Sequence, residues 1–326
     1  MPFRVNVGPP VLTINQGNTF MVTQQDGQIT ADGELGVFAK DTRFVSYYAV
    51  FANGQPWTRL NSSTTSYATS RVYLTNPAIE TEDSTIAQGT LELVLSRVAG
   101  DGIHEDIDIT NHGLTSVKFN LEVVLRSDFA DIFEVKAHHY VRRGDIDTSW
   151  NEHDRELNST YTNRDFQRRF LYQVRNASSP PRAANGRLTF WVELAAKETW
   201  HSCGYYVLIS DSVYPKGETA SQRLHIFPFQ CYESAPETEA LQQQWFDTAT
   251  QVTTAQEEIY RLYRQSLEDM GALRLYDHDF APDIWLPAAG VPWFVTLFGR
   301  DSLIVSLQNM LVRPSFALGA LKKLAQ

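Results

Sequence analysis

Residues 117–125 read Val-Lys-Phe-Asn-Leu-Glu-Val-Val-Leu, a run in which apolar and polar side chains alternate. A period of two is typical of a β-strand with one buried face and one solvated face. Residues 103–109 alternate in the same way, and Asn53-Gly54 between apolar runs predicts a tight β-hairpin. Further β-rich runs occupy residues 43–51, 91–95, 132–140, 170–174, 188–194 and 205–209. Many strands without an interleaved helical period indicate a mainly β fold, a large antiparallel sandwich over residues 1–234.

After Ser234 the apolar period becomes that of helices. Pro236 suits a first helical turn, and Thr254-Ala-Gln-Glu257 predicts a capping box that opens a second helix, which Gly271 ends. Apolar stripes predict two more helices on either side of Pro314. We expect linker helices over residues 235–275 and the start of a further helical domain over residues 276–326. Since the last stripe runs to the final residues, we expect that domain to be incomplete; a docked or domain-swapped C-terminal helix is the alternative.

The 326-residue chain carries a net charge of −10 without a block of like charges. This argues against a nucleic-acid partner, which requires a basic face. No apolar run approaches the roughly 20 residues that span a bilayer, so no membrane partner is expected. Cys203 and Cys231 are too few to staple such a chain, which favours a reducing, cytoplasmic compartment. No Cys/His spacing resembles a metal site, and we expect neither a metal nor another cofactor.

Residues 288–304 read Ala-Ala-Gly-Val-Pro-Trp-Phe-Val-Thr-Leu-Phe-Gly-Arg-Asp-Ser-Leu-Ile. Aromatic rings such as those of Trp293 and Phe294 can stack on the apolar face of a pyranose. An arginine and a carboxylate, here Arg300 and Asp301, can hold vicinal hydroxyls through charge-assisted hydrogen bonds. The segment therefore has the residue types of a sugar-binding site. The alternative is structural: Asp301 or Ser302 caps a helix, Arg300 pairs with a nearby acid and the aromatics are core.

The segment from Ala289 to Ser302 resembles the motif A-G-[IVL]-P-W-F-x-x-x-[FW]-G-R-D-[ST] of bacterial amylo-α-1,6-glucosidases, which are glycogen-debranching-type glycoside hydrolases. In that family the motif lies at the start of the catalytic domain. Residues 264–273 are similar to the family's R-S-x-x-D-L-x-x-L helix, with Met270 in the place of a leucine. The β-rich part resembles the family's N-terminal domain at residues 17–29, 36–43, 111–113 and 128–135. The resemblance thus covers nearly the whole chain.

This resemblance implies an N-terminal β-supersandwich that leans on an α/α toroid of six helical hairpins. It implies hydrolysis of α-glucosidic bonds in glycogen-like substrates, with an α-glucan as the binding partner. By similarity, Arg300 and Asp301 would bind the non-reducing-end glucose before the scissile bond, and Trp293 and Phe294 would line that pocket.

Inverting glycosidases need a general acid and a general base roughly 6.5–9.5 Å apart. In the family both come from later hairpins, so we expect no catalytic residue in this chain and no activity of this chain alone. The alternative is a non-catalytic β-sandwich module that binds glucans or serves as a scaffold. Its sugar-binding face would be built from exposed aromatics, for which the sequence offers Tyr47, Tyr48, Trp57, Tyr67 and Tyr73.

Other acidic clusters are better explained by structure than by chemistry. The acidic residues between Asp277 and Asp283 match no metal-ligand spacing, and we expect a loop there. For Asp41 with Arg43, and for the segment from Asp128 to Asp131, we expect structural roles.

Overall fold

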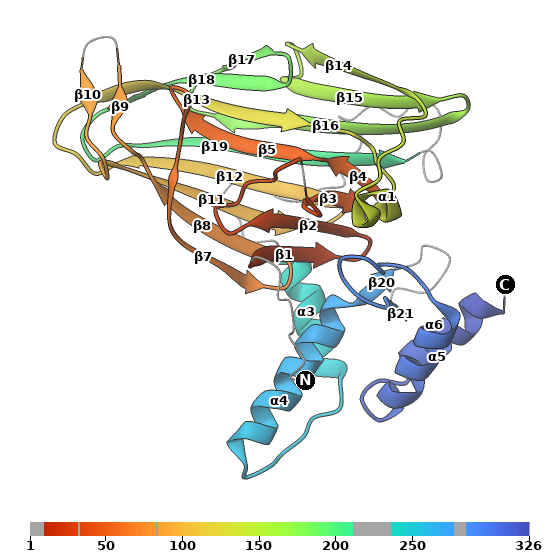
Figure 1. Cartoon of the computed structure of the whole chain (residues 1–326). Coiled ribbons are helices and arrows are strands. Elements are labelled where there is room, and N and C mark those ends of the chain that lie inside the picture. Colours follow the sequence, from red (N-terminus) through yellow and green to blue (C-terminus); the bar gives the residue numbers. More distant parts are fainter. Residues whose placement is uncertain (1–9, 32, 82–83, 211–235, 277–284, 326) are drawn as a thin grey trace, which may run out of the picture.

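The computed structural model describes residues 10–31, 33–81, 84–210, 236–276 and 285–325, and antiparallel sheets dominate it (Figure 1). The largest sheet has eight strands in the order β14-β15-β16-β19-β12-β11-β8-β7. Their bounds are β7 Thr58–Ser66, β8 Thr69–Thr75, β11 Leu91–Ala99, β12 Gly102–Asn111, β14 Asp145–Asn151, β15 Glu156–Asn163, β16 Phe166–Ala177 and β19 Thr199–Ser210. The mainly β, antiparallel fold expected from the alternating runs is confirmed.

A second sheet has five strands in the order β17-β18-β13-β5-β6. They are β5 Tyr47–Ala52, β6 Gln55–Pro56, β13 Val117–Arg126, β17 Pro181–Ala184 and β18 Arg187–Leu194. The turn between β5 and β6 is the predicted hairpin, in which Asn53 and Gly54 both have positive φ, 46° and 75°. A four-stranded sheet contains β1 Val11–Gln16, β2 Thr19–Gln24, β3 Gly36–Ala39 and β4 Thr42–Val45, and a small hairpin pairs β9 Ile79–Glu80 with β10 Thr85–Ile86.

These sheets share one apolar core, because each strand turns alternate side chains inward. Leu93 and Ile107 of the eight-stranded sheet, Leu121 and Phe190 of the five-stranded sheet and Phe38 of the four-stranded sheet are all buried in the same cluster. The predicted alternation of β13 is observed for its first seven residues, where every second side chain is buried. The outward side chains of β13 and β18 are then left to form a surface of the sandwich.

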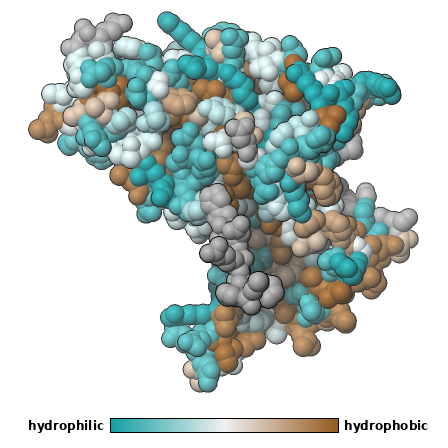
Figure 2. All heavy atoms as spheres, in the orientation of Figure 1, coloured by the Kyte–Doolittle hydropathy of each residue, from teal (hydrophilic) through white to brown (hydrophobic). Residues whose placement is uncertain are grey.

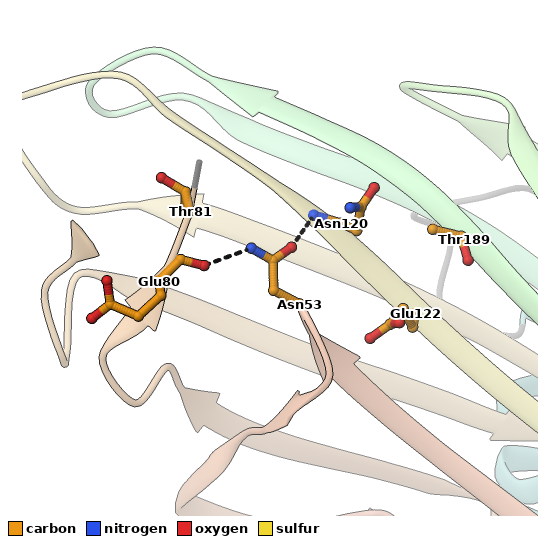
Figure 3. A pocket seen from close by; sticks show the side chains of 6 residues that line it. All are labelled: Asn53, Glu80, Thr81, Asn120, Glu122 and Thr189. Carbon is orange, nitrogen blue, oxygen red and sulfur yellow. Dashed lines mark hydrogen bonds between the residues drawn. The ribbon is translucent and has the colours of Figure 1, made fainter. Parts of the chain in front are cut away.

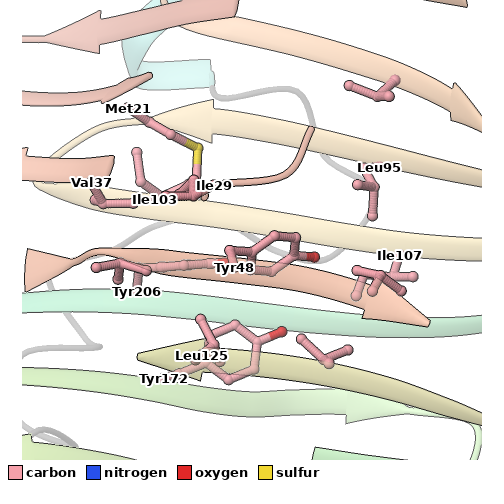
Figure 4. Close-up of a cluster of buried hydrophobic side chains, with 14 of the residues drawn as sticks. Met21, Ile29, Val37, Tyr48, Leu95, Ile103, Ile107, Leu125, Tyr172 and Tyr206 are labelled. Atoms are coloured by element: carbon pink, nitrogen blue, oxygen red, sulfur yellow. The ribbon is translucent and has the colours of Figure 1, made fainter. Parts of the chain in front are cut away.

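A buried ion pair lies inside this core. The Nε atom of Arg97 donates to Glu105 Oε2 at 2.7 Å, and the hydroxyls of Tyr172 and Tyr206 donate to Glu105 Oε1 at 3.4 and 3.0 Å. The Arg97 guanidinium lies 4.6 Å from the centroid of the Tyr48 ring. Figure 4 shows the three tyrosines among the apolar side chains of this core. Burial, and then the Glu105 carboxylate, raise the pKa of each tyrosine well above its usual value.

The prediction of a strand over residues 132–140 is wrong, because α1 (Ile132–Ala137) is a helix. The Asp131 side chain accepts a hydrogen bond from the Phe133 N–H at 2.8 Å and caps the helix N-terminus. Ile132 and Val135, three residues apart, are the buried residues of the helix. A short apolar run does not distinguish a strand from a buried helix by its period, and here the cap decides.

The segment before α1 is tied to β4 by a buried ion pair. Arg43 is almost fully buried and pairs with Asp128, and it also donates to the carbonyl of Gly33 at 3.0 Å. The carbonyl of Asp41 accepts from the Ile132 N–H at 2.9 Å. Burial, and then the Asp131 carboxylate, raise the pKa of Asp41. These contacts support the structural roles expected for these residues, although Arg43 pairs with Asp128 rather than with its neighbour Asp41.

Four helices follow the sandwich, as the change of period predicts. They are α3 Pro236–Thr248, α4 Glu257–Ala272, α5 Gly299–Gln308 and α6 Ser315–Leu324, with the short 3-10 helix η1 (Asn309–Leu311) after α5. The predicted capping box is wrong. The N-cap of α4 is Gln256, without a side-chain cap, and Thr254 accepts from the Gln256 N–H at 3.1 Å outside the helix. The loop predicted around Asp277 and Asp283 falls mostly outside the described residues.

The helices have a second, aromatic core. Trp245 of α3 is fully buried and donates through Nε1 to the carbonyl of Leu267 in α4 at 2.7 Å. Its ring meets Trp285 and Phe316 edge to face, at centroid distances of 5.5 and 5.7 Å. Gly271 lies against this ring, where a Cβ would come within 3.1 Å of the indole. This cluster therefore joins α3 and α4 to α6.

The chain between α4 and α5 packs on the sandwich. Strands β20 (Arg274–Tyr276) and β21 (Trp285–Pro287) pair with each other, and Leu286, Ala288 and Val295 belong to the sandwich core cluster. The Asn15 side chain of β1 donates to the carbonyl of Ala272 at 2.6 Å. The segment that carries the candidate sugar-binding residues is thus held beside the sandwich (Figure 1). Within the described part of the chain, no helix is long and apolar enough to cross a membrane.

Candidate functional site

The loop over residues 288–298 is closed by its own backbone. Gly290 and Phe294 exchange two backbone hydrogen bonds of 3.1 and 2.9 Å, and the Val291–Pro292 peptide between them is cis. Trp293, inside this turn, is partly buried and packs on the core cluster. The loop is therefore an ordered platform for the residues that follow it.

Phe294 is more exposed than Trp293 and lies at the junction of two elements. Its ring meets Phe298 edge to face at 5.6 Å, and Lys136 Nζ of α1 lies 4.7 Å from its centroid. With 37% of its surface accessible, Phe294 retains area for a further contact. Helix α1, which the sequence did not predict, thus borders the aromatic part of the candidate site.

Arg300 and Asp301 occupy the first turn of α5 and face solvent. Their side chains are 83% and 41% exposed, and a single contact of 3.7 Å joins the guanidinium to the carboxylate. The N-cap of α5 is Phe298 and no side chain caps it, while Ser302 is buried with its hydroxyl 3.4 Å from the Pro287 carbonyl. The alternative in which Asp301 or Ser302 caps the helix is therefore wrong. Both charged groups remain available to a ligand.

The four predicted site residues lie on one stretch of chain, the loop and the first turn of α5, and their contacts differ: Arg300 meets Asp301, Phe294 meets Phe298 and Lys136, and Trp293 meets the sandwich core. Trp293 packs on the sandwich, so a smaller part of its ring is available than the predicted pocket-lining role suggests. Next to this stretch, the outward face of α5, η1 and α6 is apolar, and Figure 2 shows this brown surface over the helices. Its exposed members are Leu303, Ile304, Leu307, Met310, Leu311, Leu318, Leu321 and Leu324.

A second polar feature, which the sequence did not predict, lies on the outer face of the five-stranded sheet. Figure 3 shows this hollow of about 590 Å³ between β5, β13 and β18 and the end of β9. It is lined by Asn53, Glu80, Thr81, Asn120, Glu122 and Thr189. The alternation of β13 and β18 indicates which side chains face outward. Only the tertiary structure shows that Glu80 and Thr81, at the end of β9, lie beside them and complete the hollow.

The face of the eight-stranded sheet that points away from the sandwich core carries a largely buried histidine cluster. His104 Nε2 lies 3.2 Å from Asp106 and 3.1 Å from the Cys203 sulfur, and His201 Nδ1 lies 2.8 Å from Asp108. His104, Asp106 and Cys203 are close enough to hold one metal ion together. Cys203 is disulfide-bonded, however, so its sulfur is not a thiolate ligand. The disulfide also differs from the expectation of reduced cysteines.

The aromatic face expected for a stand-alone binding module is not formed by the residues proposed for it. Tyr48 and Trp57 are buried, at 0% and 5% exposure. Tyr47, Tyr67 and Tyr73 are partly exposed, but Tyr47 lies on β5 of the five-stranded sheet, whereas Tyr67 and Tyr73 lie on the turn after β7 and on β8 of the eight-stranded sheet. With two of the five aromatics buried and a third on another sheet, the set does not form the expected face.

A family model described as the N-terminal domain of (some) glycogen debranching enzymes matches residues 14–204. The match covers more than half of the chain, and the chain belongs to this family. A search of curated proteins found no significant match.

Among solved structures, a kojibiose phosphorylase-like protein from the human microbiome superimposes with a TM-score of 0.60 at 10% sequence identity. The alignment covers 89% of this chain and 43% of that one. A galactose mutarotase-like protein from Lactobacillus casei (11% identity, 61% of this chain and 100% of that one) has a TM-score of 0.36. A heparan sulfate lyase HepC mutant from Pedobacter heparinus (12%, 65% and 38%) has a TM-score of 0.37. The first match shows a shared fold that continues past the sandwich, and the other two scores are too low for an argument.

Proposed function

We propose that this chain is the N-terminal portion of an α-glucan debranching glycoside hydrolase of the amylo-α-1,6-glucosidase type. Membership in the debranching-enzyme N-terminal family supports this substrate class. The proposal rests mainly on Arg300 and Asp301 at the start of α5. Both side chains are exposed, their only mutual contact is long at 3.7 Å, and neither caps the helix or belongs to a buried ion pair. Helices α5 and α6 are then the opening of an α/α toroid over residues 276–326.

In this proposal Arg300 and Asp301 orient the non-reducing-end glucose. The guanidinium donates to sugar hydroxyls and the carboxylate accepts from them, both in charge-assisted hydrogen bonds. Phe294 offers its free ring surface to the apolar side of the same sugar, and Trp293 holds the loop against the sandwich. Neither charged residue is a general acid or base, since the two catalytic carboxyl groups would follow α6.

The exposed apolar face of α5, η1 and α6 supports the proposal that further helices pack on it. In the kojibiose phosphorylase-like structure the matched region is 43% of the chain, so a larger body accompanies the same fold there. An exposed apolar surface of this extent marks an interface.

The first test compares this chain with a form that extends through the remaining hairpins, using branched limit dextrin as substrate. The 326-residue chain should release no glucose, and the extended form should release it. Glucose release by this chain at the rate of the extended form would overturn the placement of the catalytic acids after α6.

The second test introduces Arg300→Ala or Asp301→Asn into the extended form. Because each removes charge-assisted hydrogen bonds to the sugar, kcat/KM should fall by about 10- to 100-fold. Arg261→Ala is the matched control, as its side chain is 74% exposed on α4 and pairs with Glu257 at 2.6 Å away from the loop. Equal kcat/KM for all three variants would contradict the assigned roles.

A further inference from the structure

The outer face of the five-stranded sheet carries an exposed indole beside the polar hollow. Trp191 of β18 is 53% exposed. It lies directly across from Asn120 of β13, and the next outward pair along the two strands is Glu122 with Thr189. Directly opposed residues have Cβ atoms about 5 Å apart, and successive outward positions are about 7 Å apart. The indole is therefore adjacent to three of the six residues that line the hollow.

The hollow is held rigidly by hydrogen bonds within the sandwich. The Asn53 side chain donates to the Glu80 carbonyl at 3.0 Å and accepts from the Asn120 N–H at 2.8 Å, which fastens β9 to β13 (Figure 3). Glu122 accepts from the Gly54 N–H at 2.7 Å and from Arg187 at 3.0 Å. A preorganised site of this kind loses little conformational entropy when a ligand binds.

Two of the polar groups in this rigid frame are not used by the fold. Among the described residues, the side-chain amide of Asn120 and the hydroxyl of Thr189 form no hydrogen bond, although both line the hollow. An amide and a hydroxyl can each donate and accept, and the fixed Glu122 carboxylate has lone pairs left to accept with. Such a mixed set matches the hydroxyl groups of a sugar.

The charges around the hollow are of both signs, with the carboxylates in its lining. Two cations on this face are paired within the sheet, Lys118 with Glu193 at 2.8 Å and Arg187 with Glu122 at 3.0 Å. A third, the exposed Arg182 of β17, lies directly across from Thr189. The lining itself contains two carboxylates and no cation. An anionic group seated in the lining would meet the Glu80 and Glu122 carboxylates, whereas a neutral polyhydroxy chain meets no such repulsion and can also accept hydrogen bonds from Arg182.

We propose that Trp191, Asn120, Thr189 and Glu122 form a second glucan-binding site, which holds a neutral α-glucan chain on the outer face of the sandwich. This inference rests on the proposed function for its substrate class. One glucose unit stacks on the Trp191 indole, and its hydroxyls or those of the next unit bond to Asn120, Thr189 and Glu122. The hairpin of β9 and β10 lies at the end of the sandwich away from α5 and α6, so this site is separate from the Arg300 loop (Figure 1).

A separate site of this kind adds affinity for a branched polysaccharide without a new catalytic contact. Once one outer chain is held on the sheet, neighbouring chains of the same particle are presented to the loop at a raised effective concentration. The site therefore retains large, multiply branched substrates more than short oligosaccharides.

The test uses affinity electrophoresis of the 326-residue chain in gels containing glycogen. Trp191→Ala and the near-isosteric Thr189→Val should each weaken retention, Trp191→Ala by about tenfold in apparent dissociation constant. Phe166→Ala is the matched control, since Phe166 is an exposed aromatic (44%) on β16, outside the hollow. Thermal unfolding of each variant verifies the fold, which an exposed side chain should hardly affect.

A second measurement follows indole N–H resonances during titration with maltoheptaose. The resonance that is missing from the Trp191→Ala spectrum should shift in the wild-type chain. Absence of glycogen retention in the wild-type chain, or equal retention by wild type and Trp191→Ala, would overturn the proposed site.

The two proposals fail in different ways. Loss of retention in Arg300→Ala with full retention in Trp191→Ala would reject the sheet site and leave the loop site standing. Loss in Trp191→Ala with full retention in Arg300→Ala would establish the sheet site by itself. Retention in gels containing heparin in place of glycogen would reject the assignment to a neutral glucan.

Discussion

Arg97 and Glu105 show how a single pair of residues can make the sandwich depend on a charge at its centre. Both side chains are at most 1% exposed, and two tyrosine hydroxyls complete the coordination of the carboxylate. Removing one partner of a buried pair leaves the other charge in a medium that cannot solvate it. Once the pair is in place, loss of either partner is therefore costly.

Glu105→Gln should lower the free energy of unfolding by about 3–5 kcal/mol, because it leaves the Arg97 charge buried without a counter-charge. Urea denaturation at pH 7 measures this. The control is Glu193→Gln, which breaks the Lys118 pair on the surface (54% and 56% exposed) and should cost less than about 1 kcal/mol. Similar losses for the two variants would contradict the role assigned to the buried pair.

The tyrosines around Glu105 should make the fold sensitive to alkali. Their pKa values are raised in the folded state by burial and then by Glu105, so the unfolded chain loses these protons first, near pH 10. Stability is then fully present below about pH 10 and decreases above it, by about 1.4 kcal/mol per pH unit for each tyrosine. In Tyr172→Phe, the decrease of the unfolding free energy per pH unit above pH 10 should be smaller by the contribution of one tyrosine, about 1.4 kcal/mol. If tyrosinate absorbance developed fully near pH 10 in the native protein, this prediction would fail.

Helix α1, which is only six residues long, borders the candidate site. It presents Lys136 to Phe294, and its position depends on the Asp131 cap and on the Arg43 pair that holds the preceding turn. The apolar run over residues 132–140 predicts a strand, but Ile132, Val135 and Tyr140 are equally compatible with a helix. The capping interaction is local, but the position of α1 also depends on Arg43 of β4, which is more than 80 residues away in the sequence.

Asp131→Ala should destabilise the fold by about 1 kcal/mol, through loss of the cap and of its favourable charge at the helix N-terminus. Asp131→Asn should stay close to wild type, because asparagine caps equally well and no longer repels the Asp41 carboxylate. Thermal or urea unfolding of the two variants side by side measures the difference. If asparagine were as harmful as alanine, the cap would not be the stabilising contact.

In the molecule as a whole, the apolar side chains of the sandwich are buried, whereas those on the outward face of α5, η1 and α6 are exposed. The sandwich buries its apolar residues between two large sheets, whereas Leu307 and Leu311 remain 75% and 86% exposed in this chain. The apolar face of α5, η1 and α6 should therefore cause self-association of this chain in isolation.

Leu307→Lys combined with Leu311→Lys should raise the concentration at which the chain stays monomeric, as measured by light scattering. The fold should be preserved, since exposed positions usually change stability by less than about 0.5 kcal/mol. Leu114→Lys is the control, because Leu114 is 87% exposed but stands apart from the helical face. Equal scattering by the double variant and the wild type would mean that this face does not cause the association.

Local patterns predict strands such as β11 and β13, because side-chain alternation is imposed by the pleat, whereas β12 is buried on both sides over its first six residues and residues 132–137 form a helix. The apolar period likewise predicts the helices after Ser234. The contiguous motif predicts Arg300 and Asp301 as sugar-binding residues, but their exposure and the single 3.7 Å contact between them depend on the tertiary structure, since a cap or an ion pair with a distant acid could equally have engaged them.

Features built from residues far apart in the chain depend instead on how the sheets pack. Alternation places Trp191, Asn120 and Glu122 on an outward face, but the hollow exists because the Asn53 turn fastens β9 against β13. Likewise, the burial of Tyr48 and Trp57 and the Arg97–Glu105 pair depend on which sheet covers which. Periodicity reports the environment along one strand, whereas a site is a contact between strands, and contacts across a sandwich are set by packing rather than by local sequence.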